Sequence, residues 1–311
     1  MSAGAPRWIG ADEIFALGYE TAARAVQAAL RGGVEPSADF DRGILDVAHG
    51  QLLLMPSESP DYVGVKVATV APGNAERGLE RIQGTYLLMD AATLSPVALL
   101  DGAALTTLRT PAVSAAAADV LAPAAARHLV VFGSGPQALG HVRAMRAIRP
   151  LEKVTIAARN VERARALAAL VMAEGVDAAA VDPAGAGDAV ADAQLVVCAT
   201  TARHPLFDGT RVADDACVVA VGSHEPEARE LDSALMGRAQ VVVEDRAVAL
   251  REAGDVIIPV DEGLLDPFSL VPMKDVVSET LAVDRDRPRV FKSSGMSWED
   301  LVVAAAVMAG R

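Results

Sequence analysis

One short segment of the chain joins an apolar run, a glycine turn and the start of a helical stretch. Residues 129–132 read Leu-Val-Val-Phe, Gly133-Ser-Gly135 follows directly, and a helix-compatible stretch begins near Gln137. Such glycines allow a tight turn and let the backbone approach a phosphate, and the helix N-terminus attracts the negative charge. Because a second β-rich run at 154–158 follows about one βαβ unit later, the segment predicts a dinucleotide-binding Rossmann unit rather than an isolated turn.

Short β-rich runs alternate with alanine-rich helical stretches from residue 128 to about residue 260. Their nearly continuous apolar character is typical of parallel strands that are covered on both faces. The pattern therefore predicts an α/β fold with a doubly wound parallel sheet, whose ligands bind at the carboxyl ends of the strands. The expected strands are 129–132, 154–158, 177–181, 195–200, 218–221 and 241–244, and the expected helices include 137–148 and 162–173.

The first 127 residues have a different pattern, which predicts an α+β region. Helices are expected at 12–30 and 106–121, with β-like segments between them at 50–55, 62–69, 84–90 and 96–100. A last helix closes the chain, and Ser297 and Asp300 have the spacing of a capping box at its start. We expect one domain of residues 1–122 with 290–311, and a Rossmann domain of residues 123–289.

The composition argues against several classes of partner. The formal net charge of the 311 residues is −13, whereas nucleic-acid-binding proteins carry a basic face. No apolar run reaches the ~20 residues of a membrane helix, and residues 1–6 lack the features of a signal peptide. We therefore expect a cytoplasmic protein without a nucleic-acid or membrane partner. Cys198 and Cys217 lie in apolar runs, which predicts buried thiols and no metal site.

Three basic residues are candidates for ligand binding. Lys66 shares a strand face with Gly64 and Ala68, which leave room beside it, although an ordinary solvent-facing lysine has the same pattern. Arg109 has no acidic residue within seven positions, and such an arginine suits a carboxylate or phosphate ligand. Arg42 follows two aspartates and on its own has the pattern of a paired surface residue.

The five histidines differ in their expected positions. His224 follows the expected strand 218–221, so it lies at a carboxyl end where ligands bind, with a plain loop histidine as the alternative. His49, His141 and His204 are expected in loops or on helix surfaces, and His128 opens the first Rossmann strand.

The end of the second Rossmann strand indicates the choice of cofactor. Sites that prefer NAD usually carry an acidic residue there, which binds the ribose 2′-hydroxyl. This chain has Ala158-Arg159-Asn160 and no acidic residue before Glu162. Arg159 can pair with a 2′-phosphate, so we expect NADPH to be preferred, with NADH possible; a surface arginine at a helix start is the alternative.

A series of ordered motifs extends from about Arg42 to Asp300, and in these the chain resembles the ornithine cyclodeaminase/μ-crystallin family. The resemblance implies a homodimer, in which the N-terminal segments and the C-terminal helix form a substrate-binding and dimerisation domain. It also implies a nicotinamide cofactor and a reaction on α-amino or α-imino acids. The motifs are Leu54-Met-Pro56, Gly64-Val-Lys-Val67, Pro72-Gly-Asn74, Gln83-Gly84, Leu108-Arg-Thr110, Ala112-Val-Ser114, Gly133-Ser-Gly-Pro-Gln-Ala138, Arg229-Glu-Leu-Asp232, Ala253-Gly-Asp255 and Val290-Phe-Lys-Ser-Ser-Gly295.

The resemblance also assigns roles to particular residues. The substrate-carboxylate arginine of the family falls on Arg42, the active-site lysine on Lys66, and the second carboxylate or cofactor arginine on Arg109. We take Lys66 and His224 as the catalytic candidates, and Arg42, Lys66 and Arg109 as substrate-binding. The expected cofactor-binding residues are Arg109, Thr110, Gly133, Ser134, Gly135, Pro136, Gln137, Arg159, Asn160, Thr200, Val221, Ser223 and Gly295.

One departure from the family pattern favours reduction over deamination. Cyclodeaminases carry Gly-Gly-Asp-x-Pro-Gly-Lys after the fifth Rossmann strand, and this chain has Gly222-Ser-His-Glu-Pro-Glu-Ala228, which is closer to the reductase members. We therefore expect an enzyme that reduces a small cyclic α-imino acid, Δ1-pyrroline-2-carboxylate or Δ1-piperideine-2-carboxylate, to proline or pipecolate. An ornithine cyclodeaminase, an alanine dehydrogenase-like enzyme and a non-catalytic ligand-binding protein remain as alternatives.

Overall fold

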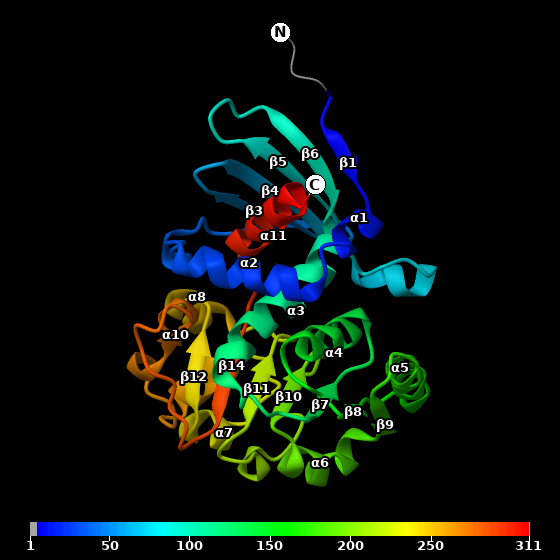
Figure 1. The fold of residues 1–311 in the computed structure, drawn as a ribbon, viewed down its shortest axis with the longest axis vertical. Helices are drawn as coiled ribbons and strands as arrows, with labels where there is room; N and C mark the ends of the chain where they lie inside the picture. Colours follow the sequence, from blue (N-terminus) through cyan, green and yellow to red (C-terminus); the bar gives the residue numbers. More distant parts are fainter. Residues whose placement is uncertain (1–4, 311) are drawn as a thin grey trace. The chain divides into compact units, whose positions relative to one another are not determined.

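The computed structural model describes residues 5–310 and divides into two compact units (Figure 1). The first unit comprises the chain up to Val113 together with the chain from Met296, and the second is Ser114–Gly295. The units therefore divide at 113 and 295, whereas the sequence suggested 122 and 289. The difference at the second boundary arises because strand β14 (Arg289–Lys292) pairs with two strands of the second unit. Residues 1–4 and 311 of the expected first domain lie outside the described residues.

The first unit is built on a six-stranded sheet in the order β1-β6-β5-β4-β3-β2, antiparallel except for the parallel pair β1 and β6. Its strands are β1 (Arg7–Ile9), β2 (Gly43–Val47), β3 (Gly50–Glu58), β4 (Tyr62–Val70), β5 (Ile82–Asp90) and β6 (Pro96–Asp101). Its helices are α1 (Ala11–Phe15), α2 (Tyr19–Arg31), α11 (Ser297–Ala309) and the first part of α3 (Gly102–Leu121). The helix expected at 12–30 is thus two helices, separated at Gly18, whose φ of 76° no α-helix accommodates.

One face of this sheet is buried beneath helices. The pairing register places Ile9, Leu100, Tyr86, Lys66 and Met55 side by side across five strands. All five are at most 3% exposed, because α11 packs against β3, β4 and α2 on this side (Figure 1). The prediction that Lys66 shares a face with small neighbours is confirmed, since Gly64 and Ala68 are buried as well. Lys66 therefore lies in an otherwise uncharged row.

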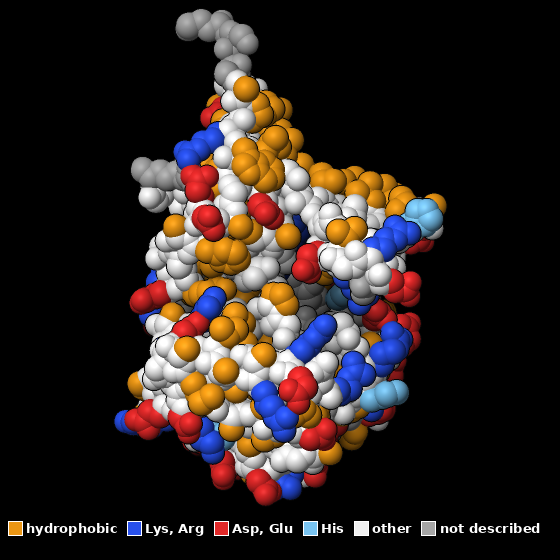
Figure 2. Space-filling view, turned by 90° about the vertical axis from the view of Figure 1, so that its right-hand side faces the viewer, with side chains coloured by type: hydrophobic (Ala, Val, Ile, Leu, Met, Phe, Trp, Pro, Cys, Tyr) orange, Lys and Arg blue, Asp and Glu red, His pale blue; other side chains and the backbone are white. Residues whose placement is uncertain are grey.

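The opposite face of the same sheet carries a second row. Trp8, Leu99, Leu87, Val65 and Pro56 are paired directly across the same strands. All five are apolar, Trp8 is 55% exposed, and the other four are half-buried. Apolar side chains are correspondingly gathered along the upper right margin of the space-filling view (Figure 2). Both faces of this sheet are thus apolar, and one of them is incompletely covered.

The second unit is an eight-stranded, fully parallel sheet in the order β13-β12-β14-β11-β10-β7-β8-β9. Its other strands are β7 (His128–Phe132), β8 (Lys153–Ala157), β9 (Asp177–Val181), β10 (Leu195–Cys198), β11 (Cys217–Ala220), β12 (Gln240–Val243) and β13 (Val271–Pro272). Its helices are α4 (Pro136–Ile148), α5 (Val161–Ala173), α6 (Gly187–Asp192), α7 (Ser233–Arg238), α8 (Arg246–Glu252), α9 (Gly254–Asp261) and α10 (Met273–Val277). The predicted doubly wound α/β fold is confirmed.

The strand order of the second unit reverses between β7 and β10, which defines the topological switch point of the sheet. Valines of the central strands are fully buried between the two helical layers, as their continuous apolar runs predicted. Cys198 and Cys217 lie inside these strands as buried free thiols, which confirms the predicted burial of both side chains. Gly133 follows β7 at the switch point, with a φ of 122°.

The two glycines of the turn after β7 make different demands on the fold. A Cβ on Gly133 would lie 2.5 Å from the carbonyl oxygen of Ala199, and its positive φ is strained for any other residue. We therefore expect Gly133→Ala to lower the free energy of unfolding by about 1–3 kcal/mol. Gly135→Ala is the matched control, because its φ is −93° and an added Cβ would meet no described atom within 4 Å. Urea unfolding measures both, and equal losses would contradict this difference.

Candidate active site

Four charged side chains form a buried group in the first unit, here called the ion cluster. Lys66 comes from β4, Arg109 from α3, and Glu299 and Asp300 from the first turn of α11. Lys66 Nζ lies 2.7 Å from Asp300 Oδ2. Arg109 Nη1 lies 2.5 Å from Glu299 Oε2, and Arg109 Nε lies 3.2 Å from Asp300 Oδ1. Each of the four residues is at most 6% exposed, so each cation requires its anion.

The start of α11 supports the two carboxylates of the cluster. A helix N-terminus stabilises negative charge, and both acidic residues lie in its first turn. The capping box predicted for Ser297 and Asp300 is wrong, because Met296 precedes the first turn and Asp300 faces Lys66. Asp39 instead accepts a hydrogen bond of 2.8 Å from the amide of Trp298. Asp300 therefore pairs with the buried charge of Lys66 and does not cap the helix of which it is part.

Burial changes the chemistry of Lys66. The removal of its ammonium group from water lowers its pKa from 10.5 to about 8, although the neighbouring Asp300 acts in the opposite direction. The charge of Arg109 lowers the pKa further. A lysine with such a pKa can hold or release a proton close to neutral pH, which is typical of functional sites.

Tyr86 places a phenolic hydroxyl in the same buried row. This hydroxyl has no hydrogen-bond partner among residues 5–310, and a Cβ on Gly64 would lie 2.0 Å from it. Burial, followed by the charges of Asp300 and Asp39, raises the pKa of Tyr86 well above its ordinary value. The phenol is therefore neutral and available as a donor next to Lys66 in the pairing register.

The third predicted substrate residue, Arg42, lies at the edge of the sheet. It is partly exposed and directly precedes β2, whose first residue, Gly43, pairs with Leu54. The next residue of β3, Met55, pairs with Lys66. Arg42 thus lies at the lateral edge of the sheet, where the register continues through Met55 to Lys66, whereas Lys66 and Arg109 are buried.

In the second unit, the turn after β7 fits the pyrophosphate of a dinucleotide. Gly133 donates its amide to Ala157, and Gly135 precedes the first turn of α4, with Pro136 at the first helical position. Packing within the described residues does not require a glycine at 135, since an added Cβ would meet nothing. A close approach by a ligand phosphate to the backbone provides the reason for a glycine there. Ser134 and Gln137 belong to the same turn and helix start.

The other predicted cofactor residues follow the carboxyl ends of neighbouring strands, apart from Thr110, which lies in α3 beside Arg109. Because parallel strands end at one edge of a sheet, these residues lie along the same edge as the turn at Gly133. They are Arg159 and Asn160 after β8, Thr200 after β10, Val221 and Ser223 after β11, and Gly295 after β14; the catalytic candidate His224 also follows β11. Arg159 is exposed, and Asn160 caps α5 by accepting a 3.0 Å hydrogen bond from the amide of Arg163.

Four of the five histidines fall into two environments, exposed and fully buried. His224 is exposed in the loop after β11, and His49 and His204 are exposed as predicted. The prediction of a surface position for His141 is wrong, because its side chain is fully buried between α4 and Ser114 of α3. Two hydrogen bonds, to Ser114 Oγ and the Gln137 carbonyl, satisfy both ring nitrogens there.

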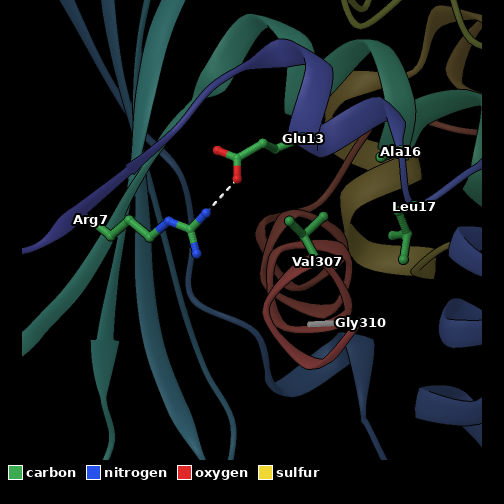
Figure 3. A pocket seen from close by; sticks show the side chains of 6 residues that line it. All are labelled: Arg7, Glu13, Ala16, Leu17, Val307 and Gly310. Carbon is green, nitrogen blue, oxygen red and sulfur yellow. Dashed lines mark hydrogen bonds and ion pairs between the residues drawn. The ribbon is translucent and has the colours of Figure 1, made fainter.

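A pocket of the first unit, with a volume of about 340 Å³, lies apart from these residues (Figure 3). It is lined by Arg7, Glu13, Ala16, Leu17, Val307 and Gly310, and its two charged side chains pair with each other. Within residues 5–310, no group of three or more His, Cys, Asp or Glu side chains is placed to hold a metal ion. No helix in the same range has the length and apolar character needed to cross a membrane.

The parallel sheet of the second unit, with its glycine turn after β7, is typical of a dinucleotide-binding protein. The first unit adds the buried ion cluster to this fold. The chain belongs to the ornithine cyclodeaminase/mu-crystallin family, whose model matches residues 19–309. The predicted family resemblance is therefore confirmed.

Individual relatives are similar over most of the chain. A Delta(1)-pyrroline-2-carboxylate reductase of Bacillus thuringiensis subsp. konkukian is 36% identical over 271 residues, which are 85% of this chain and 83% of the relative. A Delta(1)-pyrroline-2-carboxylate/Delta(1)-piperideine-2-carboxylate reductase of Azospirillum brasilense is 35% identical, covering 82% and 78%. The solved structure of Thermococcus litoralis Delta(1)-pyrroline-2-carboxylate reductase in complex with NADH and L-proline has a TM-score of 0.89 at 27% identity, covering 97% and 96%.

Three residues of the first unit were not predicted as site residues. Tyr86, Glu299 and Asp300 join the buried row and the ion cluster through contacts that are distant in sequence. One signal was present in the sequence: two adjacent acidic residues, Glu299 and Asp300, precede the long apolar stretch of the last helix. Buried carboxylates of this kind need a nearby cation, and a capping box does not provide one.

The lowered pKa of Lys66 predicts a pH dependence of stability. Between the folded-state pKa of about 8 and the ordinary value of 10.5, the unfolded chain binds more protons at Lys66 than the folded chain. The free energy of unfolding of the wild type, relative to Lys66→Met, should therefore rise as the pH increases through this window. Urea unfolding of both proteins at a series of pH values measures this difference.

Asp300→Asn provides the control for this experiment. The charge of Asp300 raises the pKa of Lys66, so its removal should start the rise at a lower pH than in the wild type. A difference between wild type and Lys66→Met that stays flat from pH 8 to pH 10.5 would rule out a lowered pKa.

Proposed function

We propose that the protein is an NAD(P)H-dependent reductase of a small cyclic α-imino acid, either Δ1-pyrroline-2-carboxylate or Δ1-piperideine-2-carboxylate. The product is proline or pipecolate. The observation that carries the proposal is a buried lysine, Lys66, with a pKa of about 8 in a chain that also has a dinucleotide turn. Relatives that are 36% and 35% identical bear the names of such reductases. A bound nicotinamide supplies the hydride, and the residues of the chain orient the substrate and handle its protons.

The three basic residues of the first unit suit an imino acid that carries a carboxylate. Glu299 and Asp300 already balance the charges of Lys66 and Arg109 inside the ion cluster. We assign the binding of the substrate carboxylate to Arg42 and Arg109, on which the carboxylate-binding arginines of the family pattern fall. The planar guanidinium group matches a carboxylate through two parallel hydrogen bonds. Lys66 would then hold a proton at the imine nitrogen, which makes the neighbouring carbon more electrophilic.

The histidine at position 224 favours reduction. Deaminating members of the family carry an aspartate at this point of the sequence, and this chain has His224. A protonated imidazole carries two N–H donors, so in that form His224 can give a proton to the imine side during reduction. Its exposure in the loop after β11 leaves the ring accessible for this role.

Product analysis separates the proposed reaction from its alternatives. The purified protein should oxidise NADPH when either cyclic imino acid is added, with proline or pipecolate as the product. It should release little or no ammonia from L-ornithine, because His224 stands where the deaminating members of the family carry an aspartate. Steady production of ammonia and proline from L-ornithine would establish a cyclodeaminase instead. Oxidation of NADPH on addition of pyruvate and ammonia would indicate an alanine dehydrogenase. Cofactor binding without turnover of any of these substrates would indicate a ligand-binding protein.

We assign cofactor binding to the turn after β7 and to the residues along the same sheet edge. These are Gly133, Ser134, Gly135, Pro136, Gln137, Arg159, Asn160, Thr200, Val221, Ser223 and Gly295, together with Arg109 and Thr110. Arg159 supports a preference for NADPH, because its exposed guanidinium follows β8 where NAD-specific sites carry an acidic residue.

The preference for NADPH should depend on Arg159. One charge-assisted hydrogen bond to the 2′-phosphate is worth roughly 1.5–3 kcal/mol, so Arg159→Ala should lower kcat/KM for NADPH by about tenfold or more. The value for NADH, which lacks this phosphate, should stay within about threefold of the wild type. Arg163→Ala is the matched control, since Arg163 is an exposed arginine in α5, the helix that follows Arg159. A tenfold preference of the wild type for NADH would refute the assignment.

A homodimer completes the proposal, because the outer row of the first sheet is apolar and incompletely covered. Soluble monomers rarely expose a contiguous apolar face of this kind. A cytoplasmic location is part of the same proposal, supported by the two buried free cysteines.

The dimer should depend on the centre of that row. Val65→Glu places a carboxylate among Leu87, Pro56 and their neighbours, so the variant should sediment as a monomer while the wild type sediments as a dimer. Leu170→Glu introduces the same charge at an exposed leucine of α5 and should leave the dimer intact. Analytical ultracentrifugation decides between these outcomes, and a monomeric wild type would contradict the proposal.

A further inference from the structure

Three sequence motifs of the second unit meet in one buried group of charges, here called the Lys292 triad. Glu230 comes from the segment before α7, Asp255 from α9, and Lys292 is the last residue of β14. Lys292 Nζ lies 3.5 Å from Asp255 Oδ2. All three residues are at most 1% exposed. The triad lies outside the residues assigned so far to substrate or cofactor.

The triad is bound to the backbone of residues 222–228, here called the His224 loop. Lys292 Nζ donates a hydrogen bond of 2.6 Å to the carbonyl oxygen of Ser223, the residue directly before His224. The Glu230 carboxylate accepts a hydrogen bond of 2.7 Å from the amide of Gly222. The two residues before His224 are therefore hydrogen-bonded to buried charged side chains of the triad.

The residue after His224 is held from the same side. The carbonyl oxygen of Glu225 accepts a hydrogen bond of 3.2 Å from the amide of Gly254, which directly precedes Asp255. Asp255 Oδ1 in turn accepts hydrogen bonds from the amides of Glu230 and Leu231, at 2.7 and 2.8 Å. The backbone on both sides of His224 is thus bonded to the triad or to its immediate neighbour, while the imidazole is exposed.

The energetics of this arrangement favour a role beyond stability. Burial of a lysine and two carboxylates costs several kcal/mol per ion, and apolar residues of similar volume often stabilise a fold equally well. Buried charges do, however, fix hydrogen-bonded neighbours in one geometry. Here the fixed neighbours are the backbone groups that flank an exposed histidine.

We propose that Lys292 is a positioning residue, which holds His224 in the geometry required for imine reduction. The proposal rests on the function proposed above, in which His224 exchanges a proton with the substrate. Removal of Lys292 deprives the Ser223 carbonyl of its donor and leaves Glu230 and Asp255 without their cation. The two carboxylates then repel each other beneath the loop, and the position of His224 changes.

A double-mutant cycle in the full-length protein tests this coupling. Lys292→Met and His224→Gln should each lower kcat for the cyclic imino acid by about 10- to 100-fold, because small displacements of a catalytic group have effects of this size. The combined variant should be no slower than His224→Gln by more than about threefold, since no histidine remains to be positioned. The KM for NADPH should stay within about threefold of the wild type in His224→Gln, because His224 is not among the residues assigned to the cofactor.

Two further variants separate positioning from folding. Lys292→Met/Asp255→Asn removes a positive and a negative charge together, and it should show the same loss of kcat if Lys292→Met alone is too unstable to purify. Arg289→Met removes another buried cation of β14, which donates to the carbonyls of Leu121 and Asp215. This control should lower the melting temperature and leave kcat within about threefold of the wild type.

Amide hydrogen exchange provides a readout that does not depend on turnover. Loss of Lys292 should accelerate amide exchange in residues 222–225, whereas Arg289→Met should not. Unchanged exchange in this loop, wild-type kcat in the Lys292 variants, or losses that multiply in the combined variant would each overturn the inference. A wild type that reduces no cyclic imine would refute the proposed function instead, and the exchange experiment would still decide whether Lys292 holds the loop.

Discussion

The ion pair between Lys66 and Asp300 joins residues that are 234 positions apart, and the first unit depends on it. A lysine in a buried row is tolerated only with a counter-charge nearby, which the last helix brings. The same helix also contributes Glu299, the partner of Arg109. The chain therefore leaves the first unit at Val113, forms the whole second unit, and returns at Met296. The second unit is thus inserted between Arg109, which needs a counter-charge, and the acidic residues of α11 that provide it.

Both units solve the cost of buried charge in a similar way. In the first unit two cations and two anions surround the row that carries the proposed proton-handling lysine, Lys66. In the second unit Lys292 is paired with Asp255 and donates to backbone carbonyls under an exposed loop. Full burial makes each group expensive, and the surrounding partners make it rigid. Stability and geometry are thus linked wherever the protein places a charge in its interior.

Local patterns predicted most strands of both units and missed two in each, β1 and β2 in the first and β13 and β14 in the second. A parallel strand covered on both faces is a continuous apolar run, so strands such as β7 and β10 were recognisable from a few residues each. The short strands β1 and β2 were not predicted, because their pairing with β6 and β3 is set by contacts elsewhere in the sheet. Asp300 was misread for the same reason: a capping spacing is local, and its partner Lys66 is not.

Burial of single polar residues was also beyond the reach of local patterns. His141 has the spacing of a surface residue on α4, yet the hydroxyl of Ser114 and a helix carbonyl satisfy its ring in the interior. The sequence predicted which face of the strand carries Lys66. It did not predict how deeply the side chain is buried, because that depends on the packing of α11 against β3 and β4. The sequence therefore indicated which residues matter in the first unit, and the structure shows how their charges are balanced.

The discontinuous first unit has a consequence for synthesis on the ribosome. Lys66 and Arg109 leave the ribosome long before Glu299 and Asp300 are translated. Until then the buried row would enclose cations without anions, so the nascent first unit cannot close its core. The strands and helices of Ser114–Gly295 lie in one continuous stretch, and this unit can complete its fold while the first waits. The docking of α11 therefore completes the core of the first unit.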